Sequence, residues 1–280
     1  SIPNDMIEFI TNLETNIEKA IKALNNNSGF SMSEVSLLSP VLNPPSVKDG
    51  YAFRQHVATA RRNRGLEMIP EFDEIPIFYF TNHHAVYGEG DFHVLNDHLD
   101  KLDFELECAA VIGKKGRNIS ASDADNYIAG FMIMNDLSAR GMQMKEMKLN
   151  LGPAKGKDFG STFGPFLVTK DELEDYRISS PEGDRYNLQM KAFVNDIQVS
   201  EDNLSNMNWT FAQIIERISY GADIFPGDII GSGTCGTGCF LELNGSKITD
   251  NQWLKTGDNV KLQIDQLGSL SNTIVLDKNG

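Results

Sequence analysis

Apolar residues between Asn4 and Leu24 recur at steps of three and four residues, which is the spacing of an amphipathic helix. The polar run from Asn25 to Gly29 predicts the end of that helix. A connector that contains proline and serine follows, LLSPVLNPPS, and it predicts a boundary. We therefore expect a short helical N-terminal extension over residues 1–46 and a main domain over residues 47–280.

Short β-rich segments dominate the main domain, namely IPIFYF, DFELECAAVIG, YIAGFMIMN, GPFLVT, NLQMKAFVN, DIIGSG, CFLELNG and NVKLQIDQLG. Helices are predicted around 138–149, in ASDADN and in WTFAQIIERISYGA, where four apolar residues share one face. Strands and helices do not alternate regularly. The pattern therefore disfavours a doubly wound parallel sheet and predicts a β-rich α+β domain.

The charge of the chain limits its partners. The 280 residues include 39 Asp and Glu against 25 Lys and Arg, a formal charge of −14. Such a charge repels nucleic acid and acidic membrane surfaces, so neither is expected as a partner. The N-terminal sequence lacks the pattern of a signal peptide, and no run of about 18 apolar residues occurs in the sequence. Three cysteines, none in a C-x-x-C pair, suit a reducing compartment, and a cytoplasmic protein is predicted.

Two glycine-rich motifs invite a nucleotide-binding interpretation. Gly231 to Gly236 match G-x-G-x-x-G, but the predicted strand CFLELNG follows instead of a helix, so no helix N-terminus is expected to receive a pyrophosphate. Gly152 to Asp158 resemble a P-loop that is one residue short and has Asp where Ser or Thr should bind magnesium. Both interpretations are rejected.

Four acidic residues are candidates for a metal site. Glu105 and Glu107 lie two residues apart, so in a strand both carboxylates project from one face, although a half-buried strand would present its solvent face in the same way. Asp136 directly follows the apolar run FMIMN, where a buried strand enters a loop. Asp49 could form an ordinary Asp-Gly turn. Together, four carboxylates without Cys or His would suit a hard cation, Mg²⁺ first, with Ca²⁺ or Mn²⁺ as alternatives.

These acids belong to a longer series of blocks, which continues with MNDLSARGMQ, LGPAKGKDFGSTFGP and GSGTCGTG. From about Val47 to the end, the series resembles the successive signatures of the fumarylacetoacetate hydrolase family. The resemblance implies the β-rich mixed-sheet roll or sandwich of a fumarylacetoacetase C-terminal domain. It also implies that Asp49, Glu105, Glu107 and Asp136 hold one divalent cation. Members of the family are commonly homodimers, so a homodimer is expected.

The segment YAFRQH resembles the hydrolase branch of that family. This resemblance implies that His56 is the general base and that Glu242, in the predicted strand CFLELNG, orients it. Without the resemblance, His56 would be a structural histidine in a helix-like segment, and Glu242 an ordinary outward residue of a strand. The other histidines lie in polar loop sequence and have no predicted role; they are His83, His84, His93 and His98.

The resemblance implies further residues around the substrate. Lys157 would stabilise developing negative charge, Gln143 would hydrogen-bond the substrate, and Arg140 would brace the site. Four more residues would complete the pocket: Tyr51, Tyr79, Gly233 and Thr234. The last two would offer donors to a carboxylate, and packing in the core is an alternative for Tyr79.

The predicted activity is metal-dependent hydrolysis of a carbon–carbon bond in a small β-diketo acid such as fumarylacetoacetate or an acylpyruvate, with His56 and Glu242 activating water. The family arginine nine positions after the base falls on Gly65, and this departure leaves the choice of diketo acid open. One alternative is a metal-dependent isomerase or decarboxylase of a dicarboxylic keto acid in aromatic-compound degradation. A non-catalytic metal-binding scaffold is another.

Overall fold

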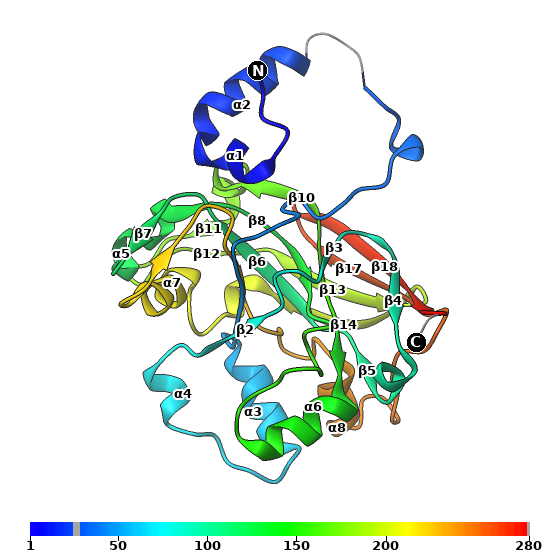
Figure 1. Ribbon diagram of the computed structural model, residues 1–280. Helices are drawn as coiled ribbons and strands as arrows, with labels where there is room; N and C mark the ends of the chain where they lie inside the picture. Colours follow the sequence, from blue (N-terminus) through cyan, green and yellow to red (C-terminus); the bar gives the residue numbers. More distant parts are fainter. Residues whose placement is uncertain (25–28, 279–280) are drawn as a thin grey trace.

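The computed structural model describes residues 1–24 and 29–278. Its centre is a seven-stranded mixed sheet (Figure 1). In spatial order the strands are β2 (Phe78–Thr81), β1 (Val47–Gly50), β16 (Ile229–Gly231), β6 (Leu106–Ile112), β8 (Ile128–Asn135), β10 (Ser161–Thr169) and β3 (Val86–Tyr87). The β1–β16 and β10–β3 pairs are parallel, and the other pairs are antiparallel.

A second sheet has five strands, and three ribbons of two strands complete the β-structure. The five strands, in spatial order, are β14 (Ile197–Asn203), β13 (Gln189–Val194), β17 (Asn259–Ile264), β18 (Gly268–Leu276) and β4 (Gly90–Val94). The ribbons pair β11 (Arg177–Ile178) with β12 (Arg185–Tyr186), β15 (Asp223–Ile224) with β7 (Gly116–Arg117), and β5 (Leu102–Asp103) with β9 (Ser138–Ala139). This arrangement confirms the predicted β-rich α+β class.

The helices are short and lie around the sheets. The α-helices are α1 (Met6–Thr11), α2 (Leu13–Leu24), α3 (Arg54–Arg62), α4 (Glu71–Glu74), α5 (Ala121–Ala124), α6 (Arg140–Glu146), α7 (Phe211–Ser219) and α8 (Phe240–Gly245). The 3₁₀ turns are η1 (Met32–Glu34), η2 (Asn96–Leu99), η3 (Asp125–Tyr127), η4 (Met147–Leu149), η5 (Lys170–Tyr176) and η6 (Leu204–Asn206). Figure 1 shows α1 and α2 at one end of the molecule and α3, α6 and α8 at the other. None of the helices in the described ranges is long and apolar enough to cross a bilayer.

Strand β6 is buried on both faces, because alternate side chains belong to two different core clusters. Leu106, Cys108 and Ala110 face the main core, where β6 and β8 pack against β13, β17 and β18 of the second sheet. Ala109 and Val111 face a smaller cluster that includes Ile10 of α1. The interpretation of the Glu105–Glu107 segment as a solvent face is therefore wrong.

Three local predictions need correction. The N-terminal helix is two helices that meet at Asn12, whose backbone leaves the helical region (φ −127°, ψ 51°). The predicted stop signal falls mainly on residues 25–28, which lie outside the described residues. The helix predicted around 138–149 begins only at Arg140, after strand β9. The segment CFLELNG is not a strand, because residues 240–245 form α8. The division at residue 46 stays a prediction.

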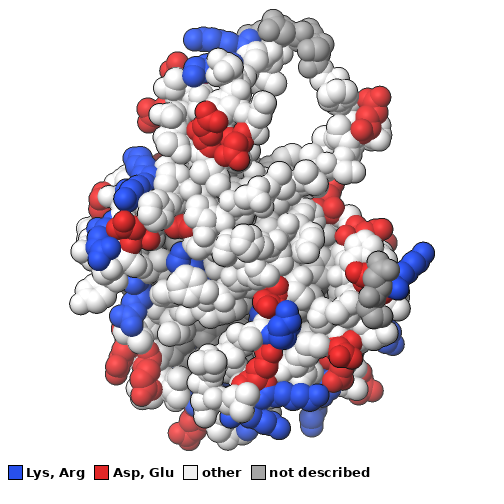
Figure 2. Space-filling view, viewed as in Figure 1, with Lys and Arg blue, Asp and Glu red and all other residues white. Residues whose placement is uncertain are grey.

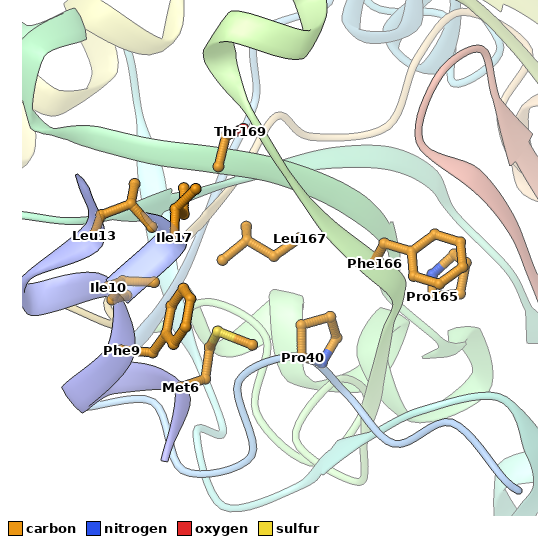
Figure 3. A pocket seen from close by; sticks show the side chains of 10 residues that line it. All are labelled: Met6, Phe9, Ile10, Leu13, Ile17, Pro40, Pro165, Phe166, Leu167 and Thr169. Carbon is orange, nitrogen blue, oxygen red and sulfur yellow. The ribbon is translucent and has the colours of Figure 1, made fainter. Parts of the chain in front are cut away.

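An apolar cavity of about 370 Å³ lies between the N-terminal helices and β10 (Figure 3). Its lining is apolar except for Thr169 and contains no titratable side chain. Figure 2 shows positive and negative side chains interspersed toward the end of the molecule that carries α3 and α6, while the middle of that face is mostly uncharged. Charged side chains also lie at the end that carries α1 and α2, so they leave free only the middle of this face.

Candidate active site

The four predicted metal ligands converge. Each of them offers a carboxylate oxygen, and these oxygens lie within 4.8 Å of one another in buried surroundings. Asp49 is in β1, Glu105 and Glu107 lie at the start of β6, and Asp136 directly follows β8. The antiparallel register pairs Glu107 with Met134, so the start of β6 lies beside the end of β8. Sheet topology thus brings together residues that are distant in the chain.

A glycine makes room for this cluster. Strand β16 lies between β1 and β6, and Gly231 pairs with Asp49 on one side and with Ala109 on the other. A Cβ atom at this position would lie 2.3 Å from Asp49 Oδ1 and 3.0 Å from Glu107 Oε2. Any side chain larger than hydrogen would therefore occupy the space into which the carboxylates point.

Two cations lie against one side of the cluster. Lys157 Nζ donates to Asp136 Oδ2 at 2.6 Å and also to Glu105. Arg140 Nη2 donates to Glu105 Oε1 at 2.8 Å, and its Nε donates to Asp103 Oδ2 at 2.9 Å. Five buried carboxyl groups, the four of the cluster and Asp103, are thus matched by two positive side chains. The cluster as a whole lacks positive charge.

The pKa shifts of the carboxyl groups indicate that positive charge is lacking on the side of the cluster away from Lys157. Burial and the Asp136 carboxylate raise the pKa of Asp49 to about 7. Burial and Asp49 raise the pKa of Glu107 well above its usual value. Burial also acts to raise the pKa of Glu105, but Lys157 and Arg140 outweigh it and hold that pKa far below its usual value. The raised pKa values of Asp49 and Glu107 mean that a nearby positive charge would stabilise both carboxylates, so the cluster fits a divalent metal site.

A buried oxygen atom without a hydrogen-bond partner also fits a metal site. Glu107 Oε2 is buried without a hydrogen-bond partner in the structure as described. A buried carboxylate oxygen without a donor is costly unless a cation or a proton compensates it. All four predicted ligands are carboxylates, which are the donors that hard divalent cations prefer.

The predicted base and its orienting acid also meet. His56 on α3 and Glu242 on α8 are buried, and Nδ1 of the imidazole lies 2.6 Å from Glu242 Oε2. The remaining oxygen, Glu242 Oε1, has no partner among the described residues. Cys239 lies beside this pair. Asp103 accepts from the start of α8 and from Arg140, which also donates to Glu105, so the His56–Glu242 pair is linked to the acidic cluster through these two side chains. Glu242 is thus a buried helix residue instead of an outward strand residue.

The other predicted residues mostly contact the cluster itself. Tyr79 donates its hydroxyl to Asp136 Oδ2, so core packing does not describe its environment. Gly233 N donates to Asp49 Oδ1 at 3.0 Å, and Thr234 Oγ1 donates to Glu107 Oε1 at 3.4 Å. These two donors are therefore directed at the protein's own acids, and their contact with a substrate carboxylate stays a prediction.

Two predicted residues contact neighbours of the acidic cluster, namely Arg140 and His56. Gln143 Oε1 accepts from Arg140 Nη1 at 2.9 Å, and the ring of Tyr51 meets the imidazole of His56 edge to face at 5.8 Å. His83 and His84 contact each other, with ring centroids 4.0 Å apart. Neither belongs to the clusters of possible metal ligands found in the described part of the chain.

One residue of the site was missed. Asp103 Oδ1 accepts from Phe240 N at 2.7 Å, and Asp103 Oδ2 accepts from Leu241 N at 3.0 Å and from Arg140 Nε. A single buried carboxylate thus fixes the start of α8, which carries Glu242, and also the arginine that holds Glu105. Its sequence signal was its place two residues before Glu105, in the same alternating series of acids.

The nucleotide interpretation fails for a different reason from the one given above. A helix, α8, does follow the G-x-G-x-x-G loop. However, Gly231 faces Asp49 and Glu107, and the N–H of Gly233 already donates to Asp49. A pyrophosphate at this loop would meet carboxylates where it needs donors.

Comparison with known sequences identifies the family of the chain, and comparison with solved structures supports its fold. The family model described as the fumarylacetoacetate hydrolase C-terminal domain matches residues 46–275. The chain is 31% identical over 278 residues to the mitochondrial oxaloacetate tautomerase fahd2 of Xenopus laevis, covering 98% of this chain and 80% of that protein. It is also 31% identical over 290 residues to an oxaloacetate tautomerase of Bacillus subtilis (strain 168), covering 98% and 87%.

A crystal structure of a putative HpcE protein from Mycobacterium smegmatis aligns with a TM-score of 0.74 at 22% identity, covering 99% of this chain and 90% of that one. At this identity the likeness supports the fold alone: a mixed sheet that curls into a half-barrel, with helices at the N-terminal end. The family model covers most of the chain, and the relatives align over nearly its whole length. The chain therefore belongs to the fumarylacetoacetate hydrolase family.

Proposed function

We propose that the protein is a metal-dependent tautomerase that interconverts the keto and enol forms of a small β-keto acid, with oxaloacetate as the first substrate to test. The observation that carries the proposal is the buried His56–Glu242 pair beside the four-carboxylate cluster. Enolisation needs a base for a carbon-bound proton and an electrophile for the carbonyl oxygen. The two tautomerases that are 31% identical over nearly the whole chain support the choice of reaction.

Asp49, Glu105, Glu107 and Asp136 would hold the cation, Mg²⁺ first, with Mn²⁺ or Ca²⁺ as alternatives. The bound ion would supply a Lewis acid that polarises the carbonyl of the keto acid. Lys157 neutralises the Glu105 and Asp136 side of the site and would favour the anionic substrate.

His56 would move the proton. With its Nδ1–H donated to Glu242 Oε2, the imidazole keeps the Nε2 lone pair free to take a proton from the substrate carbon. Glu242 then stabilises the imidazolium that forms. The exposed fractions of His56 and Glu242 are only 6% and 2%, so little bulk water reaches the base. A sheltered base favours proton transfer within the substrate over attack by water.

The test follows the relaxation of freshly dissolved oxaloacetate by its enol absorbance. With saturating Mg²⁺, we expect the protein to speed keto–enol relaxation well beyond the rate with Mg²⁺ alone. Excess chelator and, separately, the His56→Ala substitution should remove the acceleration. A relaxation rate equal to that of Mg²⁺ in buffer would contradict the proposal.

A second candidate is the C–C hydrolase predicted from the sequence, acting on fumarylacetoacetate or an acylpyruvate. The specific observation in its favour is again the hydrogen-bonded pair, because His56 oriented by Glu242 could activate a single trapped water. Mass spectrometry of products from a panel of diketo acids distinguishes the two candidates, since only hydrolysis adds water and splits the substrate.

The location and the assembly state stay predictions. A cytoplasmic location is untested, and the relatives include both mitochondrial and bacterial proteins. The homodimer is supported by exposed apolar side chains on the connector after α2, where Phe30, Met32 and Leu38 face solvent.

A further inference from the structure

The start of α8 carries a Cys-x-x-Glu pair that faces a histidine. Cys239 is the N-cap residue of α8, and Glu242 lies in the first turn of that helix, three residues farther on. His56 approaches this pair from α3. One ligand atom from each of the three side chains lies within 4.8 Å of the other two, and all three side chains are buried.

An independent observation marks this group as a donor set. Glu242 is 2% exposed, and although its Oε2 bonds to His56, its Oε1 has no hydrogen-bond partner among the described residues. The group therefore offers a nitrogen, a sulfur and a carboxylate oxygen with unused acceptor capacity. Such a mixed set suits a soft or borderline cation such as Zn²⁺, whereas the adjoining all-carboxylate cluster suits a hard one.

We propose that His56, Cys239 and Glu242 form a second cation site, selective for thiophilic ions such as Zn²⁺, whose occupation disables the base. Tetrahedral zinc with bonds of about 2.0–2.3 Å separates its ligands by about 3.5 Å. His56 Nδ1 and Glu242 Oε2 are closer than this, at 2.6 Å, so an ion bound between them would replace their hydrogen bond. The inhibitory part rests on the proposed function, but the binding part does not.

Cobalt(II) tests the binding part without any activity assay. The protein is first saturated with Mg²⁺, and Co²⁺ is then titrated while the near-ultraviolet absorbance is recorded. We expect a thiolate-to-cobalt charge-transfer band at one equivalent, which carboxylate ligands alone cannot produce. Cys239→Ser should lose the band. Cys235→Ser is the matched control, because Cys235 is also buried and lies four residues away in the same loop but outside the cluster; this variant should keep it.

Two results of the cobalt titration would contradict the second cation site. A wild-type protein without the band contradicts the site whether or not the variants fold, and a band lost in Cys235→Ser but kept in Cys239→Ser places the ligand elsewhere. Circular dichroism melts confirm that each variant is folded.

Zinc inhibition tests the regulatory part. At saturating Mg²⁺, Zn²⁺ should lower wild-type activity. Half-inhibition of Cys239→Ser should need about tenfold more Zn²⁺ or beyond, because even the loss of an outer-shell partner weakens a metal site by that factor. Equal inhibition of both proteins would mean that zinc acts at the carboxylate cluster, and the regulatory part would be wrong. If none of the keto acids is turned over, the proposed function fails, while the cobalt band still reports on the site.

Discussion

Removal of the divalent cation should destabilise the protein strongly at pH 8 and weakly at pH 5. Burial and the neighbouring Asp136 raise the pKa of Asp49 from 3.8 to about 7 in the folded protein without metal. The folded carboxyl group therefore keeps its proton up to about pH 7, whereas the unfolded one releases it near pH 4. Its stabilising effect is complete below the unfolded pKa and is lost as the pH rises through the folded pKa.

The size of the destabilisation follows from the difference between the folded and unfolded pKa values of Asp49. A shift of about three pKa units corresponds to about 4 kcal/mol at about 1.4 kcal/mol per unit, and about 3 kcal/mol of it falls within the usable window from pH 5 to pH 8. Taking roughly 2 °C per kcal/mol for a chain of this size, the melting temperature of the metal-free protein should fall by about 6 °C from this group alone. A divalent cation binds the deprotonated carboxylate and reverses the loss.

The assay is a thermal melt at pH 5 and pH 8, with excess chelator or with saturating Mg²⁺. The informative quantity is the difference in melting temperature between the two metal conditions, because the effects of pH that do not depend on the metal cancel in it. This difference should grow with pH in the wild type and grow less in Asp49→Ala, which lacks that carboxyl group but keeps Glu107, whose pKa is also raised. A wild-type difference that is the same at both pH values would refute the electrostatic reasoning.

Three further predictions concern single side chains. His56→Ala should keep Mg²⁺ binding measured by calorimetry but lose turnover by about two orders of magnitude or more, and full activity would remove the base assignment. Gly231→Ala should weaken Mg²⁺ binding by roughly tenfold or more, because its Cβ would lie 2.3 Å from Asp49 Oδ1; unchanged affinity would show that the carboxylates do not need that space. Asp103→Asn should lower turnover by roughly 10- to 100-fold and alter its pH profile, because the amide has one acceptor oxygen and no negative charge. Either the Phe240 N–H or the Leu241 N–H and Arg140 Nε would then lose their acceptor, and an unchanged profile would make Asp103 merely structural.

Three of the four predicted acidic ligands have a local signature in the sequence. Glu105 and Glu107 alternate along a strand, and Asp136 follows a run of apolar residues that must be buried. Their convergence with Asp49 is not a local property. It depends on the strand order β1–β16–β6–β8. Strand β16, which lies between β1 and β6, comes from residues 229–231, far from the other three strands in the chain. Only the resemblance to a known family supplied that information.

The error at CFLELNG has a similar cause. Apolar residues occupy positions that suit a strand as well as one turn of helix, and intrinsic preference over six residues is too weak to decide. The helix begins where it does because Asp103, 137 residues earlier, accepts from the N–H groups of Phe240 and Leu241. A capping residue supplied by a distant strand leaves no trace in the local sequence, so the helix could not be predicted.

The G-x-G-x-x-G loop shows how one set of letters can satisfy a different physical requirement. In a dinucleotide site such glycines let the backbone approach a pyrophosphate. Here Gly231 lacks a side chain because two carboxylates occupy that space, and Gly233 takes a positive φ of 76° while its N–H is donated to Asp49. Both glycines thus serve the acidic cluster. The same loop then leads into α8, so the chain passes directly from a loop that contacts the predicted metal ligands to Glu242, the residue predicted to orient the base. A change in the loop should therefore disturb metal affinity and proton transfer together, which separates this site from one in which the two functions lie on independent elements.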